Sequence, residues 1–185
     1  MIFHQTEISG VVLIKPEPVL DERGFFSRLT CMREFADHGL ATNFVQTSVS
    51  SNITSGTLRG MHFQLPPHSE TKLVSCTRGA IFDVIVDIRP NSDTYGKWFG
   101  TEITTTNKHI LYIPENIAHG FITLEDNTET YYQMNEYYAP GHARGIRWND
   151  EAVGIDWPMK PVVVSGKDKN LPSIAELAAT TEGSI

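Results

Sequence analysis

The sequence predicts an all-β protein, folded as a jelly-roll barrel with short peripheral helices. Short runs of β-forming residues follow one another along most of the chain, and turn-forming residues separate them. Helical patterns are few, and regularly spaced short strands with little helix are typical of a sandwich or barrel. The predicted strands cover Val11–Ile14, Phe44–Val49, Leu58–Gln64, Leu73–Arg78, Ile81–Ile88, Trp98–Thr104, Ile110–Ile113, Phe121–Leu124, Thr130–Tyr138 and Val162–Ser165.

The run Ile81–Ile88 has the clearest strand pattern. Its even-numbered residues are all apolar, whereas its odd-numbered residues alternate isoleucine with aspartate. A period of two is expected of a strand whose two faces differ. Turn signals flank this strand at Arg78-Gly79 and at Pro90-Asn91-Ser92.

Two short segments have helical character. Met32–His38 is followed by Gly39, and glycine suits the left-handed position that commonly ends a helix. Ser173–Ala179 predicts a second short helix late in the sequence. We find no internal repeat or linker, so we expect residues 1–185 to form one domain.

Composition restricts the classes of function. Lys and Arg number 15 against 22 Asp and Glu, which gives a formal net charge of -7. That balance argues against a nucleic-acid-binding protein, which needs a basic excess. No run of 18 apolar residues predicts a membrane span. The opening MIFHQTEISG lacks the pattern of a secretory signal, and Cys31 and Cys76 read as free thiols, so we expect a cytoplasmic protein.

Two segments, Leu58–Gln64 and Ile113–Phe121, each place a histidine in or beside a predicted strand. One interpretation is a metal-binding barrel of the cupin type, in which His62 and His119 share an ion with other ligands. Gln64 stands where a second histidine of that motif is expected, and it is an inferior ligand. His68 and Glu70 could replace it only after a bend in the chain. Two hydrogen-bonded core histidines are the plainer alternative.

A third interpretation is acid–base chemistry without a metal. Strand parity turns Lys72 to the same face as Val74 and Cys76, so a long cation is expected inside the barrel. A buried lysine is costly unless it is paired. An interior that holds His62, Lys72 and Tyr132 is suited to moving a proton and stabilising an oxyanion.

At these residues the sequence resembles the dTDP-4-dehydrorhamnose 3,5-epimerase family. The resemblance runs in order from about residue 10 to residue 170. Its motifs are Asp21-Glu22-Arg23-Gly24-Phe25-Phe26, Thr57 to Gln64, Lys72-Leu73-Val74, Gly79 to Val84, Tyr95-Gly96-Lys97-Trp98, Ala118-His119-Gly120-Phe121, Tyr137-Tyr138-Ala139-Pro140, Arg144 to Trp148, Gly154 to Pro158 and Ser165-Gly166-Lys167-Asp168.

That family implies a cupin-like jelly roll without metal or other cofactor. It also implies a homodimer acting on a nucleotide-linked 4-keto-6-deoxy sugar, for polysaccharide or other deoxysugar biosynthesis. His62 matches the base that removes a proton beside the keto group, and Asp168 matches its carboxylate partner. Tyr132 matches the acid that returns a proton, and Lys72 the group that holds the enolate oxygen. Substrate-binding positions carry over to Arg23, Phe26, Gln46, Arg59, His119, Tyr138 and Lys167.

Some residues depart from the family pattern, and all are on the binding side. Arg28 reverses the charge of a usual glutamate, Thr47-Ser48 replaces Asp-Asn, and Ala143 replaces another glutamate. These changes favour retained chemistry with altered recognition, so CDP and GDP stay open beside dTDP. Inversion at C3, C5 or both also stays open. Asp83 is expected either to orient His119 or to be an ordinary surface carboxylate.

Three other functions compete with the epimerase. A nucleotide-sugar 3,4-ketoisomerase would also shuttle protons through an enediol, and its product would carry the keto group at C3. A non-catalytic jelly roll that binds sugar nucleotides would not need the whole set His62, Lys72, Tyr132 and Asp168. A metal-dependent cupin oxygenase would be exposed by elemental analysis.

Overall fold

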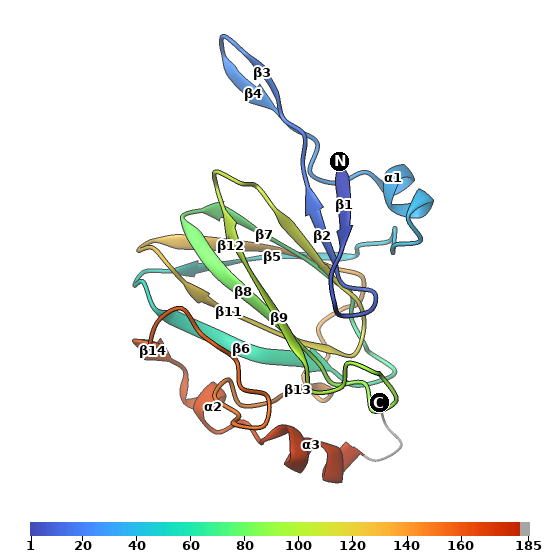
Figure 1. The fold of residues 1–185 in the computed structure, drawn as a ribbon, viewed down its shortest axis with the longest axis vertical. Helices are drawn as coiled ribbons and strands as arrows, with labels where there is room; N and C mark the ends of the chain where they lie inside the picture. The colour runs from blue at the N-terminus through green and yellow to red at the C-terminus, as the bar shows by residue number, and fades with distance from the viewer. Residues whose placement is uncertain (182–185) are drawn as a thin grey trace.

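The computed structural model describes residues 1–181 and contains two facing β-sheets, as Figure 1 shows. One sheet has the strand order β1-β2-β10-β7-β12-β5, and the other has the order β13-β6-β11-β8-β9, with β14 paired to β6. The strands are β1 Ile2–Gln5, β2 Val12–Lys15, β3 Val19–Asp21, β4 Gly24–Phe26, β5 Gln46–Asn52, β6 Thr57–Gln64, β7 Lys72–Arg78, β8 Ala80–Asp87, β9 Trp98–Thr104, β10 Ile110–Ile113, β11 Ile117–Thr123, β12 Thr128–Met134, β13 Ala143–Gly145 and β14 Val163–Val164. The helices are α1 Met32–Asp37, α2 Gly166–Lys169 and α3 Ile174–Thr181.

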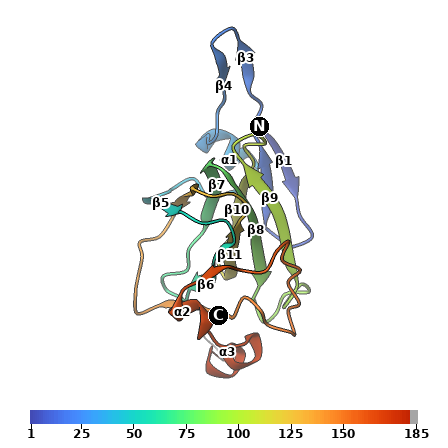
Figure 2. The same cartoon turned by 90° about the vertical axis from the view of Figure 1, so that its left-hand side faces the viewer.

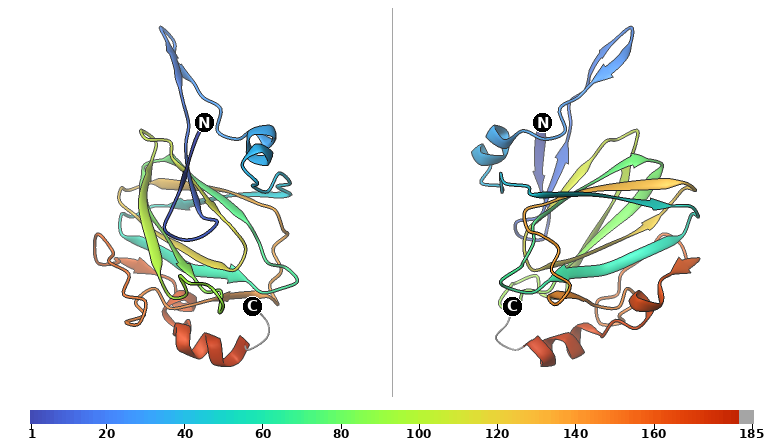
Figure 3. Two further views of the ribbon diagram at one scale, coloured as in Figure 1. Left: turned by 45° about the vertical axis from the view of Figure 1, so that its right-hand side comes forward. Right: turned by 180° about the vertical axis from the view of Figure 1, so that it is seen from behind.

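The alternating strands divide the apolar residues into three cores. Residues such as Val74, Ile81, Ile85 and Phe121 fill the space between the sheets. A second core covers the outer face of β6, β8 and β11 and includes Ile174 and Leu177 of α3. A third lies against α1, around Phe35, Val12 and Ile110. Short helices therefore cover the outside of a sandwich whose interior is left to strand side chains (Figure 3).

The predicted all-β jelly roll is confirmed, and most predicted strands occur within a few residues of their expected bounds. The strands β9 and β10 have the predicted bounds, and the predicted helices correspond to α1 and α3. Sequence patterns missed β1, β3, β4, β13 and α2, which are all four residues or shorter. A strand of three or four residues is too short to establish a period. No helix among residues 1–181 has the length and apolar character needed to cross a membrane.

The hairpin of β3 and β4 lies outside the barrel. Both strands pair only with each other, and they extend away from the two sheets in views at right angles (Figures 1 and 2). Its apolar side chains are open to solvent, with Leu20 and Phe26 each 77% exposed. Phe25 contacts Lys108, whose Nζ lies 4.3 Å from the ring centroid, but the exposed Leu20 and Phe26 leave an apolar surface suited to contact with another molecule.

A register shift in β6 turns two functional candidates, Arg59 and His62, toward the same cavity. His119 of β11 pairs with His62, but Phe121 pairs with Arg59, so β6 carries one additional residue in this interval. Gly60 lies at this bulge with a φ of 143°, and a Cβ there would lie 2.6 Å from the Cα of Gly120. Only glycine fits so close an approach. Strict alternation would place Arg59 and His62 on opposite faces, whereas both line the same cavity.

Candidate active site

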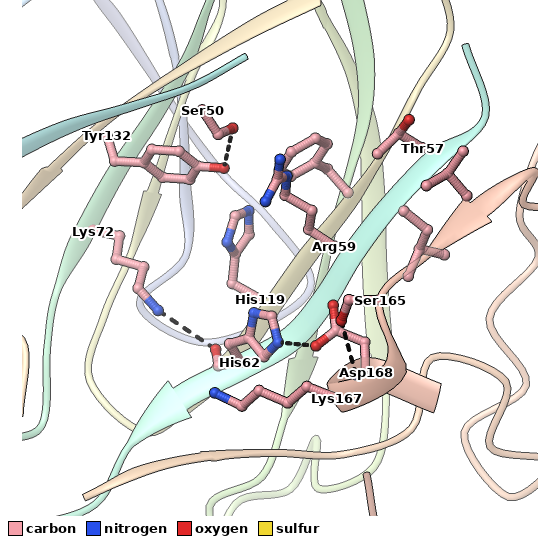
Figure 4. A pocket seen from close by; sticks show the side chains of 13 residues that line it. Ser50, Thr57, Arg59, His62, Lys72, His119, Tyr132, Ser165, Lys167 and Asp168 are labelled. Atoms are coloured by element: carbon pink, nitrogen blue, oxygen red, sulfur yellow. Dashed lines mark hydrogen bonds and ion pairs between the residues drawn. The ribbon is translucent and has the colours of Figure 1, made fainter. Parts of the chain in front are cut away.

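A cavity of about 510 Å³ opens between the two sheets. Strands of both sheets contribute to its wall, and the segment around β14 and α2 closes one side (Figure 4). Its lining residues are Ser50, Thr57, Leu58, Arg59, His62, Lys72, His119, Phe121, Tyr132, Val163, Ser165, Lys167 and Asp168. The four residues predicted to be catalytic, His62, Lys72, Tyr132 and Asp168, are therefore together in one cavity.

His62 and Asp168 form a hydrogen-bonded pair. Nε2 of His62 lies 2.7 Å from Oδ1 of Asp168. An ionised carboxylate can only accept, so Nε2 carries the hydrogen of this bond and Nδ1 is the nitrogen left to accept a proton. Figure 4 shows this second ring nitrogen turned away from Asp168. The pair therefore orients the imidazole with Nδ1 free of Asp168.

The sequence around α2 places Asp168. Ser165 caps the helix, and its Oγ accepts the backbone N–H of Asp168 at 3.0 Å, which sets Asp168 in the first turn. Burial alone would raise the pKa of Asp168, but hydrogen bonds from His62, Gly60 and Ser165 outweigh it and hold the pKa below its usual value. Asp168 is therefore ionised at neutral pH.

Tyr132 faces this pair from the other sheet. It belongs to β12, whereas His62 belongs to β6, and Figure 4 shows the two side chains entering the cavity from opposite sides. Its hydroxyl lies 3.3 Å from Oγ of Ser50. Burial raises the pKa of Tyr132, and the contact with Ser50 offsets only part of the rise. The phenol thus stays protonated and can donate.

Lys72 brings a buried positive charge to the cavity. Its Nζ lies 2.7 Å from Oε1 of Glu70 and donates to the carbonyl oxygen of His62 at 3.4 Å. Only 11% of the Lys72 side chain is exposed. The inward direction predicted from strand parity is confirmed.

His119 and Asp83 form a second histidine–carboxylate pair. Nε2 of His119 lies 2.7 Å from Oδ1 of Asp83, and Asp83 is fully buried. Burial raises the pKa of Asp83, and His119 opposes the rise. The alternative of an ordinary surface carboxylate is wrong, because the alternation of β8 turns Asp83 inward with Ile81 and Ile85.

Arg59 and Lys167 supply the remaining cations at the cavity. The Arg59 Nε donates to Oδ1 of Asn52 at 2.7 Å, and Asn52 is itself buried. Lys167 lies on α2, next to Asp168, and is exposed. Both side chains border the open part of the cavity, where an anionic group can reach them.

Four predicted substrate-binding residues do not line the cavity. Arg23 and Phe26 lie on the protruding hairpin, where Arg23 pairs with Asp21. Gln46 accepts the backbone N–H of Tyr138 at 3.1 Å, so it holds the segment that carries the exposed Tyr138. Their roles in binding stay predictions.

The residues that depart from the family pattern are not among the residues that line the cavity, although Ser48 shares a strand face with the lining residue Ser50. Arg28 pairs with Glu34 of α1 at 2.8 Å. Thr47 is exposed, whereas Ser48 lies on the same face of β5 as Ser50 and Asn52. Ala143 pairs with Gln64 in the β13–β6 register.

The sequence analysis did not identify several of the residues that line the cavity. Ser50 precedes Asn52 by two residues on β5, and their shared inward face is visible in the alternating burial of that strand. The sequence does carry a signal for this site, because serine and asparagine are unusual on an inward strand face and therefore indicate a functional cavity. Val163 and Ser165 line the cavity through the packing of the late segment against β6, which no local pattern predicts.

The residues weighed as metal ligands have other partners. Gln64 uses its amide to bond the backbone of His68, Tyr137 and Ala139. His68 lies 3.6 Å from Glu136. Over residues 1–181, no three His, Cys, Asp or Glu side chains gather as a metal site would require.

Comparison with known proteins gives one consistent family. The sequence model of the family described as dTDP-4-dehydrorhamnose 3,5-epimerase matches residues 5–176. A dTDP-4-dehydrorhamnose 3,5-epimerase of Sinorhizobium fredii is 43% identical over 178 residues, covering 96% of this chain and 91% of the relative.

Solved structures agree with the sequence comparison. A 4-keto-6-deoxy sugar epimerase from the novobiocin biosynthetic gene cluster of Streptomyces spheroides superposes with a TM-score of 0.93 at 34% identity, covering 98% of this chain and 91% of the other. A dTDP-6-deoxy-D-glucose-3,5-epimerase of Legionella pneumophila, in complex with dTDP-4-keto-L-rhamnose, has a TM-score of 0.91 at 34% identity, covering 97% and 95%.

Proposed function

The chain belongs to the dTDP-4-dehydrorhamnose 3,5-epimerase family and is an isomerase, and we propose that it inverts C3, C5 or both in a nucleotide-linked 4-keto-6-deoxy sugar by proton transfer. One observation carries the mechanism. His62 and Tyr132 come from opposite sheets and face each other across one cavity. A sugar ring held between them has a proton acceptor on one face and a proton donor on the other.

The proposed reaction begins at the His62–Asp168 pair. A hydrogen on the carbon beside the C4 ketone is acidic because the ketone can take up the negative charge as an enolate. Nδ1 of His62 takes this proton, and Asp168 stabilises the imidazolium that forms. The C–H electron pair becomes the C–C double bond of the enolate, and the C4 oxygen becomes the oxyanion.

Lys72 and His119 stand where they can stabilise that oxyanion. Both line the cavity, and the ammonium of Lys72 is a nearly buried charge held at its wall by Glu70. One such donor contributes about 100-fold to 1,000-fold in rate. Tyr132 then gives its hydroxyl proton to the carbon from the opposite face, which inverts the configuration. The enzyme returns to its starting state by exchanging protons with solvent.

We assign dTDP as the nucleotide carrier of the sugar. The related proteins are named for dTDP sugars. Arg59 and Lys167 give the open side of the cavity two cations, which suits a diphosphate. Arg28, the one added positive charge among the departures, is already paired with Glu34, which reduces the case for a more anionic carrier.

We infer that the enzyme works as a cytoplasmic homodimer in which each hairpin completes its partner's cavity. Arg23 and Phe26 are expected to contact substrate, yet they lie on a hairpin that extends away from its own barrel. A symmetric dimer could bring the hairpin of one protomer to the cavity of the other. The exposed apolar residues of the hairpin, such as Leu20 and Phe26, support burial in that interface.

Product analysis tests the function. Purified protein is incubated with dTDP-4-keto-6-deoxyglucose, and the sugar products are identified by NMR. We expect epimers at C3, C5 or both, and their identity gives the regiochemistry. A product with the keto group at C3 would instead identify a 3,4-ketoisomerase. The CDP- and GDP-linked sugars are compared in parallel, and a higher kcat/KM for either would overturn the assignment of dTDP.

A further inference from the structure

Glu70 is an acidic residue beside the cavity to which the proposed mechanism gives no role. It lies in the segment between β6 and β7, two residues before Lys72. Only 12% of its side chain is exposed, and its Oε1 lies 2.7 Å from Nζ of Lys72. The two side chains form a nearly buried ion pair at the wall of the active site.

The contacts of Lys72 show what this pair accomplishes. An ammonium group has three N–H donors. One donates to the carbonyl oxygen of His62 at 3.4 Å, and Glu70 holds the ammonium by the ion pair at 2.7 Å. Lys72 lines the cavity, so these two fixed contacts leave an N–H that can donate to a substrate oxygen.

The charged groups around Lys72 show why Glu70 matters to it. The other titratable side chains around Lys72 are His62, His119 and Tyr132 at the cavity, Arg59, Lys167 and Asp168 at its border, and Asp83 behind His119. Asp168 and Asp83 are each hydrogen-bonded to a histidine. Glu70 is thus the carboxylate in direct contact with Lys72, and a nearly buried ammonium is costly without such a partner.

We propose that Glu70 is a positioning residue that anchors the ammonium of Lys72 and directs its free N–H at the C4 oxygen of the substrate. This inference rests on the proposed epimerase function. Glu70 touches neither the substrate nor the reacting atoms, and it acts only through Lys72. Its loss should therefore affect the stabilisation of the enolate more than the binding of the nucleotide.

The test compares Glu70→Gln with wild type in kcat and KM. Glutamine keeps the size and an acceptor oxygen but removes the charge. We expect kcat to fall about 10-fold with KM nearly unchanged, because the oxyanion donor is less well placed. Glu70→Asp keeps the charge and should recover part of the lost kcat.

The controls separate this inference from folding and from the proposed function. Glu102→Gln, the same change at an exposed position of β9, should leave kcat and KM unchanged. A Glu70→Gln variant with wild-type kcat would overturn the proposal. So would a lower kcat that comes with a lower melting temperature and that Glu70→Asp does not recover, because that indicates structural support alone. Failure of the proposed function is recognised separately, since wild type would then give no epimer.

Discussion

At the scale of single residues, the active site is organised by hydrogen bonds that fix the state of each acid and base. The carboxylate of Asp168 sets the tautomer of His62, and burial keeps the phenol of Tyr132 protonated. The proposed base and acid thus lie in one cavity, and the proposed acid Tyr132 is in the protonated form that its role requires. Asp83 repeats the arrangement at His119.

Asp168→Asn is expected to lower kcat about 100-fold, because asparagine cannot stabilise the imidazolium that forms on His62. The substrate KM should change little, since Asp168 is turned toward His62. Steady-state kinetics of purified protein measures both constants. Asp156→Asn, at an exposed position, serves as the matched control. Wild-type kcat in the Asp168→Asn variant would remove the pair from the mechanism.

Sequence motifs selected residues that the structure brings together, but not the contacts around them. His62, Lys72, Tyr132 and Asp168 were identified by motifs matched in order along the chain, and all four line one cavity. The contacts that tune them, Ser50 to Tyr132 and Glu70 to Lys72, carry no motif signal. They depend on side-chain distances that arise only when strands from different parts of the chain pair.

At the scale of elements, irregularities of the strands place the functional groups. The bulge in β6 turns both Arg59 and His62 to the cavity, although a regular strand would separate them. Strict alternation predicted β8 well because that strand is central and has distinct faces. It failed for β6, where a register shift that the sequence does not specify breaks the period.

The turn between β8 and β9 provides a test of stability at this scale. Asp87 is fully buried and accepts hydrogen bonds from Arg89, Ser92 and Thr94. Burial alone would raise the pKa of Asp87, but these hydrogen bonds outweigh it and lower the pKa to about 2. Because the folded pKa is depressed, the carboxylate stabilises the fold above its unfolded pKa, and this contribution is lost as pH falls through the folded pKa.

Asp87→Asn should therefore lower the free energy of unfolding at pH 7 by about 2 kcal/mol. The difference from wild type should shrink below about pH 4 and disappear near pH 2. Denaturant unfolding followed by tryptophan fluorescence at several pH values measures it. Asp93→Asn, at an exposed position of the same turn, controls for charge. A difference that stayed constant with pH would contradict the account.

At the scale of the whole molecule, the barrel and its protruding hairpin have separate tasks. The barrel holds the proposed acid–base groups, while the hairpin carries Arg23 and Phe26 away from them. Sequence patterns missed β3 and β4 because each is three residues long and they pair only with each other. The proposed dimer explains how residues on such a hairpin can still bind substrate.

Mixing two inactive variants tests that arrangement. His62→Asn lacks the base, and the double variant Arg23→Ala/Phe26→Ala lacks the hairpin contacts. If each hairpin serves the partner's cavity, a heterodimer of the two has one intact site. Co-expression with different tags should therefore restore about one quarter of the sites when pairing is random. No gain in activity over the separate variants would show that the hairpins do not complete each other's sites.

The most direct measurement for the mechanism separates proton removal from inversion. Wild type, Tyr132→Phe and His62→Asn are each incubated in D₂O with dTDP-4-keto-6-deoxyglucose, and proton NMR follows the C3 and C5 signals and the epimer formed. We predict that Tyr132→Phe still exchanges hydrogen at carbon while inversion slows about 100-fold or more, since only the acid on the opposite face is lost. His62→Asn should abolish both. Inversion at the wild-type rate by Tyr132→Phe would contradict the assignment of acid and base to opposite sheets.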